Sequence, residues 1–140
     1  MIVSTKGRYA LAVMIELAEH PREGFVPLSE ISDRLHISKE YLNSSLKLLV
    51  QGNQLLSLRG KGGGYRLADA PDRVCVGTIL RLVEGDLAPV SCVQENHKCP
   101  NCSGCRSYGM WEELDELING YLDRVYLSDF LENGKFYKSC

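Results

Sequence analysis

Apolar residues recur at three- and four-residue spacing between Ser4 and His20, which predicts an amphipathic helix. Ser4 is suited to cap the N-terminus of this helix, and Pro21 follows its last residue. The apolar stripe consists of Ala10, Val13, Met14, Leu17 and Ala18. We expect this stripe to belong to the protein core and not to a binding face.

Two further helical patterns follow, separated only by His36 and Ile37, and they predict a helix-turn-helix. The first has Ser29 as its predicted N-cap, and the second starts after Ser38. Their inward-facing residues are Ile31 and Leu35 in the first helix and Leu42, Leu46, Leu49 and Val50 in the second. The polar face of the second helix carries Ser38, Lys39, Tyr41, Asn43, Ser44 and Lys47. These side chains suit base edges and phosphates in a major groove, although a merely solvated face would have the same composition.

The segment 55–67 predicts a β-hairpin, because two short apolar stretches flank a turn that is rich in glycine. A loop that binds nucleotide phosphates requires a helix after it, and here a strand follows. We therefore interpret the hairpin as a wing that follows the DNA backbone. Its candidate contacts are Arg59, Lys61, Gly62, Gly63, Tyr65 and Arg66.

Two more helical patterns complete the chain. Residues 76–84 predict a short helix that packs through Ile79, Leu80 and Val83. The second stripe is longer and consists of Leu114, Leu117, Ile118, Tyr121, Leu122 and Val125. The expected fold is mainly α with a small β-hairpin: a winged helix-turn-helix at 1–70, a connecting helix with a cysteine-rich loop at 71–109, and a long helix with a C-terminal tail at 110–140.

The charge distribution supports a nucleic-acid partner for the N-terminal half. The formal net charge of the whole chain is -2, yet residues 1–67 carry nine Lys or Arg against six Asp or Glu. The stretch from Tyr41 to Ala68 contains no acid, and it includes Lys47, Arg59 and Arg66. We expect phosphate contacts there. The chain shows neither a long apolar run nor the layout of a signal peptide, so we expect a cytoplasmic protein without membrane association.

The segments Ser4–Ala10, Ile37–Leu42 and Arg59–Leu67 resemble the IscR/NsrR/CymR family of bacterial winged-helix transcription regulators. The likeness continues through residues 83–90 and across the cysteines to Met110 and Trp111, where we expect the long helix to begin. The resemblance implies a homodimer in which this helix crosses its symmetry mate. It also implies repression by two recognition helices in successive major grooves of a near-palindromic operator.

Four of the six cysteines lie within fourteen residues, in the segment 91–105, which we call the cysteine loop. Cys92, Cys99 and Cys105 match the ligands of the iron-sulfur members of the family, so the resemblance implies a [2Fe-2S] or [4Fe-4S] cluster. Some relatives supply a fourth ligand from a His three residues after the last cysteine, and here that residue is Tyr108. The fourth ligand is therefore open. Cys102, which forms a Cys99-x-x-Cys102-x-x-Cys105 spacing, is one candidate and His97 is the second.

Other interpretations of the loop stay open. A zinc ion held by Cys92, Cys99, Cys102 and Cys105 is compatible with the short spacings. Alternatively the thiols bind no metal and act as a redox switch. We expect Cys75 to be a small buried apolar residue and Cys140 a terminal free thiol.

The expected function is transcription regulation controlled by iron-sulfur, redox or nitric oxide status. Nothing in the sequence predicts an enzyme, because no histidine is accompanied by a hydrolase-like arrangement. One alternative is a CymR-like regulator that is controlled by an enzyme of cysteine metabolism. Another is an iron-sulfur carrier or electron-transfer protein, which the basic wing disfavours.

Overall fold

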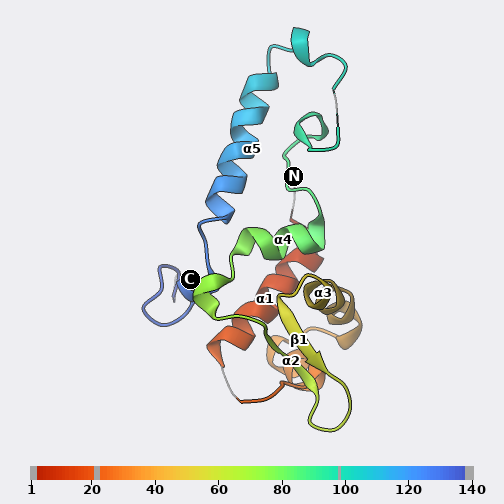
Figure 1. The fold of residues 1–140 in the computed structure, drawn as a ribbon, viewed down its shortest axis with the longest axis vertical. Helices are drawn as coiled ribbons and strands as arrows, with labels where there is room; N and C mark the ends of the chain where they lie inside the picture. The colour runs from red at the N-terminus through yellow and green to blue at the C-terminus, as the bar shows by residue number, and fades with distance from the viewer. Residues whose placement is uncertain (1–2, 21–22, 98, 138–140) are drawn as a thin grey trace.

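The computed structural model describes residues 3–20, 23–97 and 99–137. Three helices and a β-hairpin form the lower part of the molecule in Figure 1. These are α1 (Thr5–Glu19), α2 (Leu28–Leu35), α3 (Lys39–Gln51) and the strands β1 (Leu55–Leu58) and β2 (Gly64–Leu67). Two more helices follow, α4 (Val76–Glu84) and α5 (Tyr108–Leu122). Short 3-10 turns lie at Pro71–Arg73, Ser91–Val93, Cys102–Gly104 and Leu127–Phe130. The mainly helical fold with a hairpin wing is as predicted.

Helix α1 forms the centre of the core. The Ser4 hydroxyl accepts a hydrogen bond from the Gly7 N–H at 3.3 Å, which confirms the predicted cap. All five residues of the predicted stripe are buried, and they pack against Ile31 of α2 and Leu42 of α3, both fully buried. A stripe at helical spacing therefore supplies the apolar surface on which the other helices assemble.

The start of α2 differs from the prediction. The helix begins at Leu28 with Pro27 as its N-cap, so Ser29 lies within the first turn and does not cap the helix. Val26 exchanges two backbone hydrogen bonds with Tyr65 of β2, Val26 N–H to Tyr65 O at 2.8 Å and Tyr65 N–H to Val26 O at 2.9 Å. This bridge to β2 holds the chain extended up to Val26. Helix α2 therefore begins only after the bridge, at Leu28.

The turn between α2 and α3 is as short as the sequence indicates. His36 adopts the left-handed conformation (φ 55°), and the Ile37 N–H donates to the Ser32 carbonyl at 3.2 Å. The Ser32 hydroxyl also donates to the Ile37 carbonyl at 2.6 Å. These contacts fix the angle at which α3 leaves α2, and α3 then begins at the predicted cap, Ser38.

Helix α4 packs across α1, and its cap corrects the expectation for Cys75. Ile79 and Leu80 are buried and Val83 is half-buried, as predicted. Cys75 is half-buried and not fully buried. Its sulfur accepts a hydrogen bond from the Thr78 N–H at 3.4 Å and so caps α4. The free N–H groups at a helix start need hydrogen-bond acceptors, and the Cys75 sulfur provides one here. Cys140 lies outside the described residues.

Helix α5 projects from the body beside the cysteine loop, at the opposite end of the molecule from the wing (Figure 1). The helix starts at Tyr108, before the expected Met110, and none of its described residues is buried. Val125 was expected on its apolar stripe, which is wrong: the helix ends at Leu122, and Val125 is buried against Val76 of α4. The Val76 N–H donates to the Val125 carbonyl at 2.8 Å, so this residue anchors the chain after α5 to the core.

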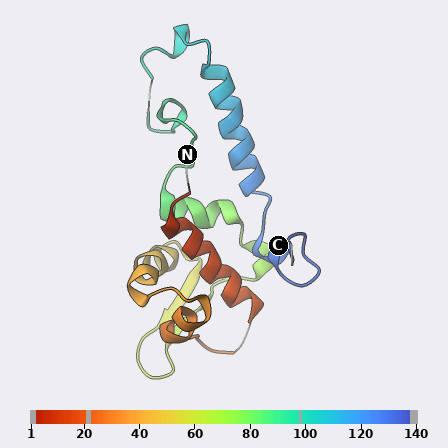
Figure 2. The same cartoon turned by 180° about the vertical axis from the view of Figure 1, so that it is seen from behind.

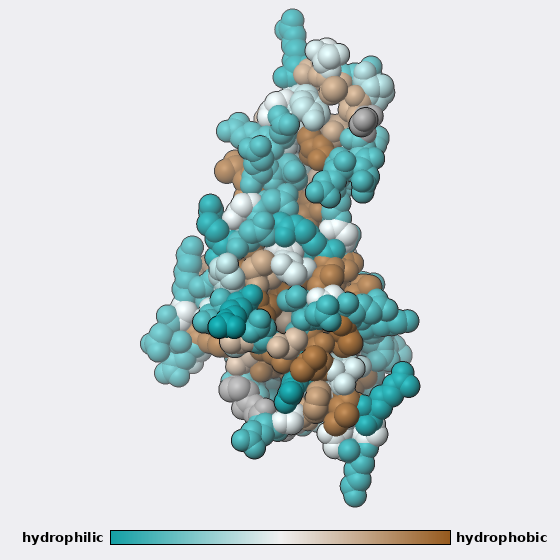
Figure 3. Space-filling model, in the orientation of Figure 1, coloured by the Kyte–Doolittle hydropathy of each residue, from teal (hydrophilic) through white to brown (hydrophobic). Residues whose placement is uncertain are grey.

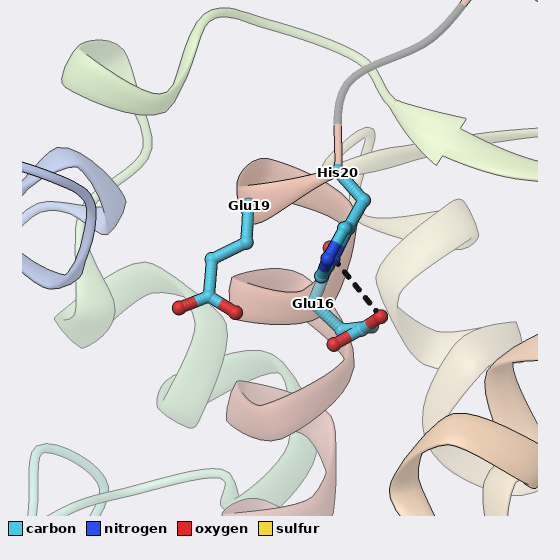
Figure 4. A group of neighbouring side chains, drawn as sticks. All are labelled: Glu16, Glu19 and His20. Atoms are coloured by element: carbon cyan, nitrogen blue, oxygen red, sulfur yellow. Dashed lines mark hydrogen bonds and ion pairs between the residues drawn. The ribbon is translucent and has the colours of Figure 1, made fainter.

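Glu16, Glu19 and His20 gather at the end of α1, where a dashed line joins His20 to Glu16 (Figure 4). The Glu16 Oε1 lies 3.1 Å from His20 Nδ1 and 3.1 Å from Arg34 of α2, which also pairs with Glu30 at 2.7 Å. Glu16, Glu19 and His20 bring their ligand-type atoms within 4.8 Å of one another. Because Arg34 already engages the inner carboxylate, we assign this group to helix pairing and not to metal binding.

Candidate nucleic-acid interface and cysteine loop

The face of α3 that the sequence assigns to DNA is open to solvent. Ser38 caps the helix, its hydroxyl oxygen accepting from the Tyr41 N–H at 3.4 Å. The residues Ser38, Lys39, Tyr41, Asn43, Ser44 and Lys47 are all exposed, whereas Leu42, Leu46 and Leu49 on the opposite side are buried. Helical periodicity therefore separates the core face of α3 from a face rich in hydrogen-bonding groups.

Glycines shape the wing at its tip and at its base. Gly60 and Gly62 have positive φ angles of 89° and 75° within the turn. Gly64, with φ 148°, lies so close to the Val26 carbonyl that an added Cβ would overlap it. The wing base thus touches the segment before α2, which only a residue without a side chain permits.

A groove of about 680 Å³ lies between α3 and the wing. Five of the predicted DNA contacts line it: Asn43, Lys47, Arg59, Gly63 and Tyr65. Apolar atoms gather on the surface of the winged-helix part in Figure 3, and β1 exposes 42% of Leu56 and 50% of Leu58. The groove combines amide, cationic and apolar groups, which are the groups that read base edges and thymine methyls.

The remaining predicted contacts lie outside this groove. Lys61 and Gly62 are exposed at the wing tip. Arg66 lines a separate hollow beside α1, and its guanidinium carbon lies 4.9 Å from the centre of the Phe25 ring. The structure therefore places Arg59 and Arg66, which look equivalent in the sequence, in different surroundings.

Two polar groove residues were missed by the sequence analysis. Gln51 lies one helical turn after Lys47, on the same face of α3. Ser57 pairs with Tyr65 across the hairpin, which places both side chains on one face of the sheet. Helical and strand periodicity were the signals that could have identified them.

The cysteine loop lies beside α5 and leads into its first residue, Tyr108 (Figure 1). Cys92 and Cys99 are half-buried, whereas Cys102 and Cys105 are exposed. All four are free thiols, and in the described part of the chain they do not converge closely enough to hold one metal ion. Thiolates are the donors that iron-sulfur clusters require, and a cluster spans more space than a single ion. Zinc also accepts thiolate ligands, so the donor set fits either group.

Cys105 lies directly before α5. Its sulfur is 3.3 Å from the Ser107 hydroxyl oxygen. This side-chain hydrogen bond, together with backbone N–H groups of Ser107 and Tyr108, lowers the pKa of the Cys105 thiol below its ordinary value. The Cys105 thiol consequently loses its proton more readily than an ordinary cysteine, and the thiolate is the form that binds metals and reacts with oxidants.

Tyr108, at the position where the family resemblance implies a histidine ligand in some members, is the first residue of α5. Its pKa is raised by desolvation and by the negative charge of Glu112, and the neighbouring thiols of Cys102, Cys92 and Cys99 act in the same direction when they ionise. The phenol therefore stays protonated, and it lies within electrostatic reach of these thiols. His97 is exposed, with its backbone N–H bonded to the Gln94 carbonyl at 3.1 Å.

Residues 3–133 match the family described as Rrf2, Iron-dependent Transcriptional regulator. The chain belongs to the Rrf2 family. A curated relative, the HTH-type transcriptional regulator IscR of Erwinia tasmaniensis, is 35% identical over 133 residues, covering 95% of this chain and 80% of the relative. The IscR of Aliivibrio salmonicida is 35% identical over 134 residues, with 94% and 77% covered.

Solved structures agree with this membership. The Bacillus subtilis protein described as CymR (YrzC), the global cysteine regulator, superposes with a TM-score of 0.75 at 33% identity, covering 93% of this chain and 95% of that one. T. potens IscR gives 0.72 at 33% identity, with 93% and 85% covered. Staphylococcus aureus CymR in its oxidized form gives 0.68 at 29% identity, with 91% and 93% covered.

The Rrf2 membership confirms the predicted class: this is a DNA-binding winged-helix transcription regulator and not an enzyme. Of the helices in the described ranges, none has the length and apolar character needed to cross a membrane.

Proposed function

We propose that this regulator is a homodimeric repressor that binds a near-palindromic DNA operator and senses iron-sulfur, redox or nitric oxide status through its cysteine loop. The observation that carries the proposal is the groove between α3 and the wing, lined by Asn43, Lys47 and Arg59. Asn43 presents an amide suited to a base edge, while the two cations suit phosphates. The cytoplasm is the compartment that this function requires.

The surface of α5 supports a second copy as partner. Met110, Leu114, Leu117 and Tyr121 are 54%, 36%, 64% and 48% exposed. Their spacing places them on one side of the helix, and apolar side chains interrupt the hydrophilic surface along α5 in Figure 3. An uncovered apolar stripe of this length favours an interface between two copies, which would present two recognition helices to two half-sites.

The cysteine loop supports a cluster held by Cys92, Cys99 and Cys105, with Cys102 or His97 as fourth ligand. A bound cluster would supply a group that gains or loses electrons and reacts with oxygen and nitric oxide. The chain itself contributes a loop that leads into α5, where the contact with Ser107 lowers the pKa of the Cys105 thiol. IscR relatives support this assignment.

The test is anaerobic purification followed by absorption spectroscopy and iron and sulfide analysis. A coloured protein with stoichiometric iron and sulfide, whose affinity for DNA changes when the cluster is removed, would support the proposal. Colourless protein with stoichiometric zinc would favour a structural zinc site instead.

The exposed, hydrogen-bonded Cys105 favours a second candidate, a regulator controlled by thiol oxidation without a cluster. In metal-free protein, Cys105 should react with iodoacetamide faster than Cys102 at neutral pH, because the lowered pKa leaves more thiolate. Ser107→Ala should slow the reaction of Cys105 alone. Operator release on mild oxidation of colourless protein would favour this candidate over the cluster. Control by an enzyme of cysteine metabolism would instead require a partner protein to change the affinity for DNA.

A further inference from the structure

The carboxylate of Glu84, the last residue of α4, lies at the N-terminus of α1. Its Oε1 accepts hydrogen bonds from the Ser4 backbone N–H at 2.8 Å and from the Ser4 hydroxyl at 2.6 Å. Figure 2 shows the start of α1 beside the end of α4. Helix N-termini favour negative charge, and hydrogen bonds to a carboxylate are stronger than neutral ones. The contact therefore fixes the first turn of α1 on α4.

Gly7 leaves the space that this carboxylate occupies. A Cβ added at Gly7 would overlap the Glu84 carboxylate oxygen and crowd the side chain of Val3. The φ angle of Gly7 is negative, so its backbone conformation does not require glycine. The nearest atom is the far end of the flexible Glu84 side chain, so a larger residue at position 7 would displace this carboxylate from its place beside α1.

The same turns of α1 hold the recognition helix α3. Ser45 of α3 is fully buried, and its hydroxyl donates to the Lys6 carbonyl in the first turn of α1 at 3.3 Å. One turn further along, the ring of Tyr9 meets the ring of Tyr41 edge to face, with centroids 6.2 Å apart. A shift in the start of α1 would therefore move both the buried side and the exposed edge of α3.

Asp86 makes the corresponding contacts on the other side of Gly85. Its Oδ1 accepts from the Ala88 N–H at 2.7 Å, and its Oδ2 accepts from the Glu95 N–H at 3.2 Å, which orders the approach to the cysteine loop. Gly85 has φ 82° and ψ -127°, a conformation open to glycine alone. The Glu84 carboxylate thus holds the start of α1, and the Asp86 carboxylate holds the start of the cysteine loop.

We propose that Glu84 is a positioning residue for DNA binding. It holds α1 in the orientation that presents α3 to DNA, and through Gly85 and Asp86 it links the cysteine loop to the recognition helix. The proposal rests on the proposed function, because it assumes that α3 contacts DNA.

The first test compares DNA affinities for a duplex that the wild-type protein selects from a random-sequence library. Removing an acid ordinarily strengthens a DNA complex through charge. Glu84→Ala should do the opposite and lose about fivefold in affinity or more, because α1 is released. Glu84→Gln keeps an acceptor oxygen and should retain most of the affinity. Glu132→Ala, the same charge change at a position outside the winged helix, should bind at least as tightly as wild type.

Combined variants test whether Glu84 acts on DNA binding through its contact with Ser4. If Glu84 acts through Ser4, then Glu84→Ala combined with Ser4→Ala should bind no more weakly than the weaker single variant. Asp86→Ala should weaken DNA binding on its own and add nothing to Glu84→Ala. Additive losses, or an unchanged affinity of Glu84→Ala, would overturn the proposal.

Hydrogen exchange separates this proposal from the proposed function. In Glu84→Ala, amides in the first turn of α1 and in α3 should exchange faster, while those in β1 and β2 stay protected. Unchanged exchange in α3 would overturn the positioning role. Failure of the wild-type protein to select any duplex would count against the proposed function, and the exchange data would still decide the role of Glu84.

Discussion

The guanidinium of Arg66 lies over the ring of Phe25, on the side of the hairpin that faces α1, whereas Arg59 lines the groove beside α3. Arg59→Ala should therefore weaken operator binding about tenfold, while Arg66→Ala should change it less than about threefold. Fluorescence anisotropy at fixed salt measures both. The slope of log affinity against log salt should also fall by about 0.9 for each phosphate that a variant no longer neutralises. Equal reductions in affinity for the two variants would contradict the different roles assigned to Arg59 and Arg66.

Asn43 faces the groove with an amide that both donates and accepts, so it can form a paired contact with adenine. Asn43→Ala should relax the preference at one base pair of each half-site, by about 1–3 kcal/mol of discrimination. A scan of half-site substitutions measures the change. Asn96→Ala, an exposed amide in the cysteine loop, is the matched control and should leave the preference as in wild type.

Leu117 is 64% exposed at the centre of the apolar stripe on α5. Leu117→Lys should yield monomers, because an interface would have to bury the added charge. Analytical ultracentrifugation at micromolar concentration measures the change. Glu112→Lys, on the opposite side of the helix, should remain dimeric. A monomeric wild-type protein at that concentration would contradict the dimer outright.

The fourth cluster ligand can be identified by substitution. Cys99→Ser should abolish or bleach the cluster, since the loss of a thiolate opens an iron to solvent. If Cys102 is the fourth ligand, Cys102→Ser should do the same and His97→Ala should keep its colour. The reverse result would assign His97. Anaerobic absorption spectra, with iron analysis of each variant, measure the outcome.

Local patterns in the sequence predicted most of the fold. Helical spacing identified the core faces of α1 and α3, and Ser4 and Ser38 were identified as caps because capping depends on residues three positions apart. Ser29 failed as a cap because a bridge from Val26 to a distant strand determines where α2 begins. Tertiary contacts of that kind leave no mark in a local window of sequence.

The functional residues divide in the same way. Periodicity placed Asn43 and Lys47 on the open face of α3, but the sequence did not distinguish Arg59 from Arg66. The contact between Ser4 and Glu84 joins residues 80 positions apart, so no spacing rule could predict it. Val125 looked like one more turn of a stripe, and only the end of α5 at Leu122 moved it into the core.

The two hydrogen bonds between Val26 and Tyr65 make the wing base part of the same rigid frame as the helix-turn-helix. These hydrogen bonds consequently fix the distance between the recognition helix and the wing. An insertion in either strand would shift the alternation of side chains and break this frame. Residues added to the turn between Leu58 and Gly64 would leave this pairing intact, so the turn is where the hairpin can change in length.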